Sequence, residues 1–168
     1  AGGHAAVAVW ARPRVAILST GDEILPPGQP LPPGRIYDSN ARIIADAVRE
    51  LGGTPVEMGI VPDDADQLRE RIAAAWASCD AVLLSGGTSK GAGDISYRVV
   101  RERHDPGVVA HGVALKPGKP LCLAVSGGKP VVILPGFPTS AVFTFHEFVA
   151  PVLRRLAGRP PESPTVRR

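Results

Sequence analysis

The stretch DAVLLSGGTSKGAGD (80–94) joins a short apolar run to a glycine-rich loop. The apolar part, 80–85, predicts a buried strand, and a helix is expected from about residue 94 to residue 103. A strand that passes through such a loop into a helix is typical of α/β proteins. In these proteins ligands collect at the carboxyl ends of the strands.

The same alternation of strands and helices extends outward along the chain. Further strands are predicted at 15–18, 56–61, 108–115, 120–125 and 131–134, and further helices near 40–51, 63–76 and 139–156. The stretch PPGQPLPPG (26–34) predicts a stiff surface loop, and Pro151 should kink the last helix or mark a join in it. We therefore predict an α/β fold, a three-layer αβα sandwich around a mostly parallel sheet.

Composition narrows the classes of function. With 168 residues, a net charge of +3 and 44% hydrophobic residues, the chain has the balance of one globular domain. It has no run of five Lys or Arg and no stretch of 18 apolar residues, so neither a nucleic-acid partner nor a membrane span is expected. Cys79 and Cys122 match no metal or disulfide pattern, which favours reduced thiols and a cytoplasmic location.

The glycine-rich loop is a candidate anion site. Successive glycines let backbone N–H groups approach a ligand, while Thr88, Ser89 and Lys90 add polar and charged groups. The alternative is an ordinary tight turn between strand and helix. Because Thr20, Gly86 and Gly136 each follow a predicted strand, we expect three special loops to converge on one rim of the sheet.

Several carboxylates near these loops have two interpretations. Asp94 either holds Mg²⁺ against a phosphate or caps the following helix. Asp22 and Glu23 either bind a metal or act as a base, or they are solvated turn residues. Residues 38–40 (DSN) are predicted first as a helix cap, and the acidic residues at 63–66 as the opening of a second helix.

Two further loops carry candidate ligand groups. In KPGKP (116–120), a Pro-Gly turn can present Lys116 and Lys119 to one anion, although a surface hairpin with incidental lysines is the alternative. In LPGFPTSA (134–141), a strand ends and Thr139 and Ser140 are predicted to cap a helix whose N-terminus suits an anion. The histidine spacings predict no zinc site.

Six motifs in one order resemble a known family. They are STGDEI (19–24), GRIYDSN (34–40), GIVPDD (59–64), LSGGTSKGAGD (84–94), KPGKP and LPGFPTSA. Over about residues 12–158 the chain resembles the molybdopterin-binding domain of molybdopterin molybdenumtransferase, the family that includes the gephyrin E region. The resemblance implies an enzyme that inserts molybdenum from molybdate into adenylylated molybdopterin, releases AMP and requires Mg²⁺.

The resemblance also implies roles for individual residues. It implies catalytic roles for Asp22, Glu23, Asp64 and Asp94, with Glu23 and Asp94 as Mg²⁺ ligands. Lys116 and Lys119 are the expected molybdate contacts. The residues that it implies in substrate binding come from the same motifs: Thr20, Ser85, Gly86, Gly87, Thr88, Ser89, Lys116, Lys119, Pro135, Gly136 and Ser140. The chain departs from the family's common residues at Thr88, Lys90, Phe137 and Thr139.

The complete enzymes of this family have further domains and act as elongated dimers. Accordingly, residues 1–12 are expected to be a linker from a preceding domain, 13–158 the molybdopterin-binding domain and 159–168 a flexible tail. The expected partners are a small anionic pterin substrate and further copies of the chain, as a dimer or trimer. The alternatives are a molybdopterin adenylyltransferase and a non-catalytic pterin-binding or sensing module.

Overall fold

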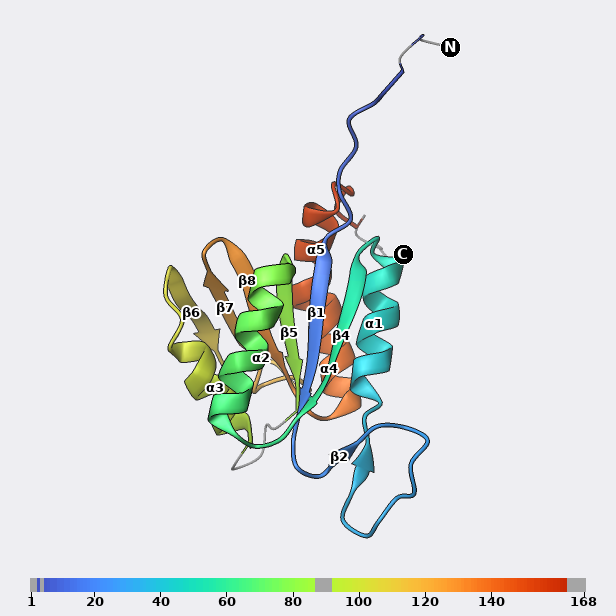
Figure 1. Ribbon diagram of the computed structural model, residues 1–168. Coiled ribbons are helices and arrows are strands. Elements are labelled where there is room, and N and C mark those ends of the chain that lie inside the picture. Colours follow the sequence, from blue (N-terminus) through green and yellow to red (C-terminus); the bar gives the residue numbers. More distant parts are fainter. Residues whose placement is uncertain (1–2, 4, 87–91, 163–168) are drawn as a thin grey trace, which may run out of the picture.

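A computed structural model describes residues 3, 5–86 and 92–162, with the side chains of 92–94 left out. Its centre is a six-stranded sheet in the order β4-β1-β5-β8-β7-β6. The strands β4, β1, β5 and β8 pair in parallel, and β7 is antiparallel to both β8 and β6, so five of the six strands run in one direction. The strands are β1 (Arg14–Thr20), β4 (Thr54–Val61), β5 (Ala81–Ser85), β6 (Pro106–His111), β7 (Cys122–Ser126) and β8 (Lys129–Leu134). The predicted mostly parallel sheet is confirmed (Figure 1).

Helices cover both faces of this sheet and complete the predicted αβα sandwich (Figure 1). On one face lie α1 (Asn40–Glu50), α4 (Pro138–Thr144) and α5 (Ala150–Leu156), and on the other lie α2 (Ala65–Ser78) and α3 (Ala92–Arg101). In β1, Val15 and Ile17 join the core under α1, whereas Ala16 and Leu18 join the core under α2. Burial on both faces explains why the parallel strands are continuous apolar runs in the sequence.

One predicted strand is too long. β6 ends at His111, so the prediction of a strand over 108–115 is wrong at its carboxyl end. Gly112 has a φ of +83°, and the Val113 N–H donates to the Lys119 carbonyl at 2.9 Å. The segment 112–121 therefore folds back on itself as a loop instead of extending the sheet.

The proline-rich stretch 26–34 is a loop, as predicted, but its two ends form an unexpected small sheet. There β2 (Ile24–Leu25) pairs in parallel with β3 (Ile36–Tyr37). The Tyr37 hydroxyl donates to the Gln29 carbonyl at 2.6 Å. This bond holds the loop against the two short strands.

The last helix changes its hydrogen bonding just before Pro151, which confirms the predicted join. Between α4 and α5 lies a π-helical turn, Phe145–Val149, in which the Ala150 N–H donates to the Phe145 carbonyl. Pro151 has no N–H to give to the preceding turn.

The chain enters and leaves the folded domain at neighbouring places. The face of Gly158 is covered by the ring of Trp10, which an added Cβ would meet at 2.2 Å. Arg159 Nη1 donates to the Glu50 carbonyl at 2.8 Å. In Figure 1 both ends leave the sheet at the edge opposite the carboxyl ends of β1, β4 and β5.

None of the helices in the described part of the chain is long and apolar enough to cross a membrane.

Candidate functional site

The three predicted loops do meet at one rim of the sheet. They follow β1, β5 and β8, which are neighbouring parallel strands, so their carboxyl ends share an edge. The side chain of Asn40, at the start of α1, joins two of the loops directly. Its Nδ2 donates to Ser85 Oγ at 2.9 Å and to the Gly136 carbonyl at 2.8 Å. The convergence on which the predicted site depends is therefore confirmed.

Close backbone packing holds the loop after β5 against the end of β1, where the third loop begins. Gly86, with a φ of +127°, lies so near the end of β1 that an added Cβ would be 2.1 Å from the Thr20 carbonyl oxygen. Thr20 is itself buried, and its Oγ1 lies 3.4 Å from Ser96 Oγ in α3. The end of β1 thus contacts both the loop after β5 and the helix beyond it.

A hollow of about 510 Å³ opens at this rim. It lies between the small β2–β3 sheet, the start of α1 and the loops after β5 and β8. The residues that line it are Glu23, Ile24, Ile36, Tyr37, Asp38, Ser39, Asn40, Ser85, Gly86, Gly136, Phe137 and Pro138. Of the residues predicted to bind substrate or metal, this hollow gathers Glu23, Ser85, Gly86 and Gly136.

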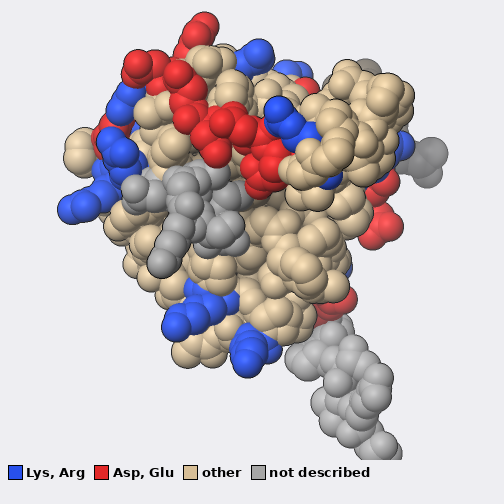
Figure 2. Space-filling model, turned by 90° about the horizontal axis from the view of Figure 1, so that it is seen from below, with Lys and Arg blue, Asp and Glu red and all other residues tan. Residues whose placement is uncertain are grey.

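Beside the hollow lies a group of acidic residues. Asp22 Oδ1 accepts a hydrogen bond from the Asp63 backbone N–H at 3.1 Å, which joins the loop after β1 to the loop after β4. Burial, and then repulsion from Asp22 and Glu23, raises the pKa of the Asp63 carboxyl. Figure 2 looks onto this rim and shows Asp and Glu side chains gathered in one band across it.

Asp64 has a clear structural task. Its Oδ1 accepts from the backbone N–H groups of Asp66 at 2.9 Å and Gln67 at 2.8 Å, so it is the N-cap of α2. This bonding satisfies two donors that the first turn of a helix leaves free. Its catalytic role stays a prediction.

At α1 the cap differs in detail from the prediction. Ser39 occupies the N-cap position but makes no capping bond with its side chain. Asp38 Oδ1 instead accepts from the Ala41 N–H at 3.0 Å. Asn40 is thereby released from capping and reaches across the rim, a role that the sequence analysis did not assign to it.

The lysine loop reaches the same edge of the sheet from another direction. Because β7 is antiparallel to both β6 and β8, the segment 112–121 lies at the carboxyl end of β8. Gly118 packs against Thr144, whose Cγ2 an added Cβ would meet at 2.4 Å. Lys116 and Lys119 are exposed on either side of this contact, and neither lines the hollow.

The last loop corrects one predicted cap. α4 begins at Pro138, and its N-cap is Phe137, which makes no capping bond with its side chain. Thr139 and Ser140 are therefore not caps. Pro138 is well suited to the first helical position because its φ is already fixed near the helical value. Pro135 and Ser140 are buried, and their predicted substrate contacts stay predictions.

Part of the predicted site lies outside the described residues. This applies to Gly87, Thr88 and Ser89, and also to Lys90. Asp94 belongs to α3, but its side chain is not among those described. The predicted roles of Asp94 in catalysis and metal binding therefore stay predictions. Within the residues that are described, no three His, Cys, Asp or Glu side chains come together as a metal site.

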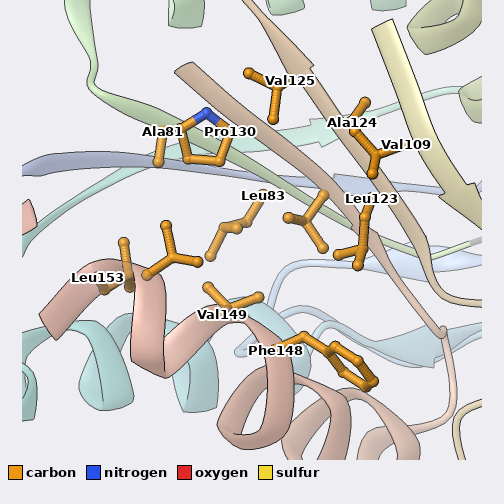
Figure 3. Close-up of a pocket in the computed structure, with 12 residues that line it drawn as sticks. Ala81, Leu83, Val109, Leu123, Ala124, Val125, Pro130, Phe148, Val149 and Leu153 are labelled. Carbon is orange, nitrogen blue, oxygen red and sulfur yellow. The ribbon is translucent and has the colours of Figure 1, made fainter. Parts of the chain in front are cut away.

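A second cavity lies away from the rim and has a different character. It measures about 200 Å³, is open on one side, and lies between β5, β6, β7, β8 and the last helical segments. All 12 lining residues have apolar side chains, including Leu83, Leu123 and Phe148 (Figure 3). Such a cavity has no side-chain group to bind a polar or charged ligand, whereas the rim hollow gathers residues of several motifs, so we take the rim as the candidate site.

Comparison with protein families agrees with the motifs on this rim. The family model described as "Probable molybdopterin binding domain" matches residues 16–155, which include β1 through most of α5. The chain belongs to this family.

Curated relatives of this molybdopterin-binding domain are longer proteins. A molybdopterin molybdenumtransferase from Nostoc sp. is 43% identical over 157 residues, which are 90% of this chain and 35% of the relative. Molybdopterin molybdenumtransferase 2 from Mycobacterium tuberculosis is 38% identical over 166 residues, 94% of this chain and 40% of the relative. The chain thus spans less than half the length of these relatives.

Solved structures give the same picture. A molybdopterin biosynthesis protein from Pyrococcus horikoshii superposes with a TM-score of 0.78 at 44% identity, covering 88% of this chain and 36% of that one. The protein CinA from Thermoplasma acidophilum, at 18% identity and a TM-score of 0.65, shares the fold alone. It covers 82% of this chain and 96% of its own.

Proposed function

We propose that this chain is the part of a molybdopterin molybdenumtransferase that binds adenylylated molybdopterin, and that the whole protein inserts molybdenum from molybdate with release of AMP. The observation that carries the proposal is the meeting of three motif loops at one rim, tied by Asn40 to Ser85 and Gly136, in a domain of the molybdopterin-binding family.

The charges around the rim support a substrate with distinct parts. Lys116 and Lys119 are exposed on a loop at the same edge of the sheet, where their positive charge would attract molybdate and phosphate. Pro135, Gly136 and Ser140 lie where the chain enters α4, and they are proposed to contact the substrate there. The hollow itself contains Glu23 and Asp38. An extended substrate with an anionic part and an uncharged part suits this division.

The proposal includes a Mg²⁺ ion that is bound jointly by the protein and by the substrate. Carboxylates are the ligands that Mg²⁺ prefers, and it is usually held by one or two of them together with substrate phosphates. Besides burial, repulsion from Asp22 and Glu23 helps to raise the pKa of the neighbouring Asp63 carboxyl, and a cation beside the hollow would offset this repulsion, although the described side chains alone form no group of three metal ligands. We assign Mg²⁺ to Glu23 and Asp94, where its chemistry would be to neutralise phosphate charge.

In this proposal the catalytic residues are Asp22, Glu23, Asp64 and Asp94. Asp22 positions the loop after β4 through its bond to the Asp63 N–H. Thr20, Ser85 and Gly86, with Gly87, Thr88 and Ser89, are proposed to contact the substrate from the loops after β1 and β5. The proposed setting is cytoplasmic and homo-oligomeric, and the two buried free cysteines suit a reducing compartment.

The decisive experiment supplies adenylylated molybdopterin, Mg²⁺ and molybdate to the whole protein that contains this domain and measures AMP. Release of AMP that depends on molybdate supports the proposal. Formation of adenylylated molybdopterin from molybdopterin and ATP would favour an adenylyltransferase instead. Tight binding with neither product would favour a binding module.

A matched pair of variants tests whether the rim is responsible. Asp22→Asn keeps the oxygen that accepts from the Asp63 N–H but removes a negative charge beside the hollow. We expect it to slow AMP release at least tenfold, the order of effect of a lost catalytic carboxylate. Asp46→Asn makes the same change on the exposed side of α1, where Asp46 pairs with Arg42, and should leave the rate unchanged.

A further inference from the structure

One part of the sheet is covered by helices on a single face. Helix α3 packs against the edge strand β6 on the face that α2 also covers. On the other face, α1 packs against β1 and β4, and α4 packs against β8. In Figure 1 the helical segments after β8 lie behind the middle of the sheet, to the side of β6 and β7. Among the described helices, none therefore lies over this second face of β6 and β7.

The apolar cavity lies at the border of the uncovered face. It measures about 200 Å³ and is open on one side. Val109 of β6 and Leu123 of β7 line it from the sheet, and Phe148 lines it from the helical segments (Figure 3). Val109 is 63% exposed, and Val152, which also lines the cavity, is 41% exposed. Neighbouring apolar side chains that remain in contact with water are typical of an interaction surface.

The sequence of β7 suits a strand with cover on both faces. Cys122 and Ala124 are buried in the core under α2 and α3. Leu123 and Val125 alternate with them, point to the other face and are only partly buried there. An antiparallel strand with one face in water usually alternates apolar and polar residues. Four consecutive apolar residues in β7 therefore indicate that a further element packs on the uncovered face.

The uncovered face has the size of one helix. Neighbouring strands lie about 4.8 Å apart, so β6 and β7 together are roughly 10 Å wide, which is the diameter of a helix. β7 has 5 residues and β6 has 6, which gives the face a length of about 20 Å. A helix of about 13 residues has this length.

Longer relatives contain more than enough polypeptide to provide such a helix. The chain covers 35% of the Nostoc relative and 36% of the superposed Pyrococcus horikoshii protein. Most of each of these proteins therefore lies outside the part that matches this chain.

From these observations we infer that the face of β6 and β7 is a docking surface for an amphipathic helix from another part of the whole protein. The helix places apolar side chains over Val109 and Leu123 and closes the open side of the cavity beside Phe148. It thereby completes the αβα sandwich. This inference concerns a face of the sheet, not its rim, and does not rest on the chemistry of the proposed function.

Two other occupants fit this face less well. Pairing of a second copy along the edge of β6 is hindered, because Pro106 has no N–H and the register with β7 shifts between Val108 and Ala110. A free apolar molecule would fill the cavity but leave the outer part of the face, with Val109, in water. A helix covers both the cavity and the strands beside it.

Cysteine reactivity in the whole protein tests whether the face is covered. The native cysteines are buried, so an introduced Val109→Cys or Val152→Cys should dominate the reaction with a water-soluble maleimide. Ala74→Cys, on the exposed side of α2, is the matched control. We expect both introduced thiols to react at least roughly tenfold more slowly than the control, because the covering helix must first open. Rates as fast as that of Ala74→Cys would overturn the inference.

A charge variant gives an independent measure of the same cover. Under a docked helix the carboxylate of Val152→Glu loses its water, so the melting temperature of the whole protein should fall by several degrees. Ala74→Glu adds the same charge on the exposed side of α2 and should change the melting temperature little. Equal melting temperatures of the two variants would contradict a covering helix.

Photocrosslinking in the whole protein identifies the occupant. The photoreactive residue p-benzoylphenylalanine replaces Val109, and mass spectrometry identifies the peptide to which it is joined after irradiation. We expect a peptide of the same polypeptide from outside residues 1–168. A crosslink only to a peptide from residues 1–168 would favour a second copy and refute the inference, and the absence of any crosslinked peptide would refute it as well.

Discussion

Replacing Gly86 with alanine should disrupt the rim, because the added methyl group has no space there. The added Cβ would lie 2.1 Å from the Thr20 carbonyl oxygen and 3.0 Å from the Thr20 nitrogen. These are backbone atoms of β1, and they cannot turn aside as a flexible side chain would. Gly86 also has a φ of +127°, a conformation that essentially only glycine adopts.

The size of the effect follows from these two causes. The strained φ costs about 1–3 kcal/mol for a residue with a Cβ. Moving the Cβ from 2.1 Å to an ordinary contact requires the end of β1 and the loop after β5 to separate by roughly 1 Å, and such overpacking costs about 1–3 kcal/mol. Together the free energy of unfolding of Gly86→Ala should fall by about 2–6 kcal/mol.

Urea denaturation followed by circular dichroism measures this loss. Gly28→Ala is the matched control, because Gly28 has a φ of +92° but nothing within 4 Å of its added Cβ. The control isolates the strain, so its loss should be about 1–3 kcal/mol. If Gly86→Ala lost no more stability than Gly28→Ala, the close packing of the loop on β1 would not be a constraint and the reasoning would be refuted.

Substitutions at three further residues test two charges of the rim and the cap of α2. Asp63→Asn should raise the melting temperature at neutral pH, because burial and then Asp22 raise the Asp63 pKa and so disfavour its ionised form in the folded state. That gain should shrink as the pH falls through the raised pKa, where folded Asp63 is already protonated; a gain independent of pH would contradict this cause. Lys119→Ala should weaken molybdate binding in calorimetry, with a smaller difference at high salt, and an unchanged affinity at low salt would exclude the contact. Asp64→Ala should lower the free energy of unfolding by about 0.5–2 kcal/mol in urea denaturation, while Asp64→Asn, which keeps the capping oxygen, should lose much less; equal losses would argue against the cap.

Much of the fold could be predicted because apolar runs and helix spacing are local signals. Parallel strands that are buried on both faces stand out as continuous apolar stretches, so β1, β5 and β8 were recognisable. The convergence of Thr20, Gly86 and Gly136 also followed, since neighbouring parallel strands end at one edge. These predictions needed only that each loop follow a strand of one mostly parallel sheet.

What escaped prediction depends on contacts between distant segments. Asn40 bonds to residues 45 and 96 positions away in the chain. In the sequence, the triplet Asp38-Ser39-Asn40 is indistinguishable from an ordinary helix cap. β2 and β3 have two residues each, too few to show a period. The predicted strand over 108–115 ran past His111 because valine and leucine continue in the loop, where only the φ of Gly112 marks the turn.

The contact between Trp10 and Gly158 places the point where the chain enters the domain next to the point where it leaves. Because the polypeptide enters and leaves at that place, on the far side from the rim, tags or reporter proteins can be fused there without reaching the rim. For the same reason a short peptide could join the segments next to Trp10 and Gly158 while new ends are opened in a surface turn, a rearrangement that domains of this kind tolerate. The domain could therefore be inserted into other polypeptides through these two adjacent segments, with its pocket undisturbed.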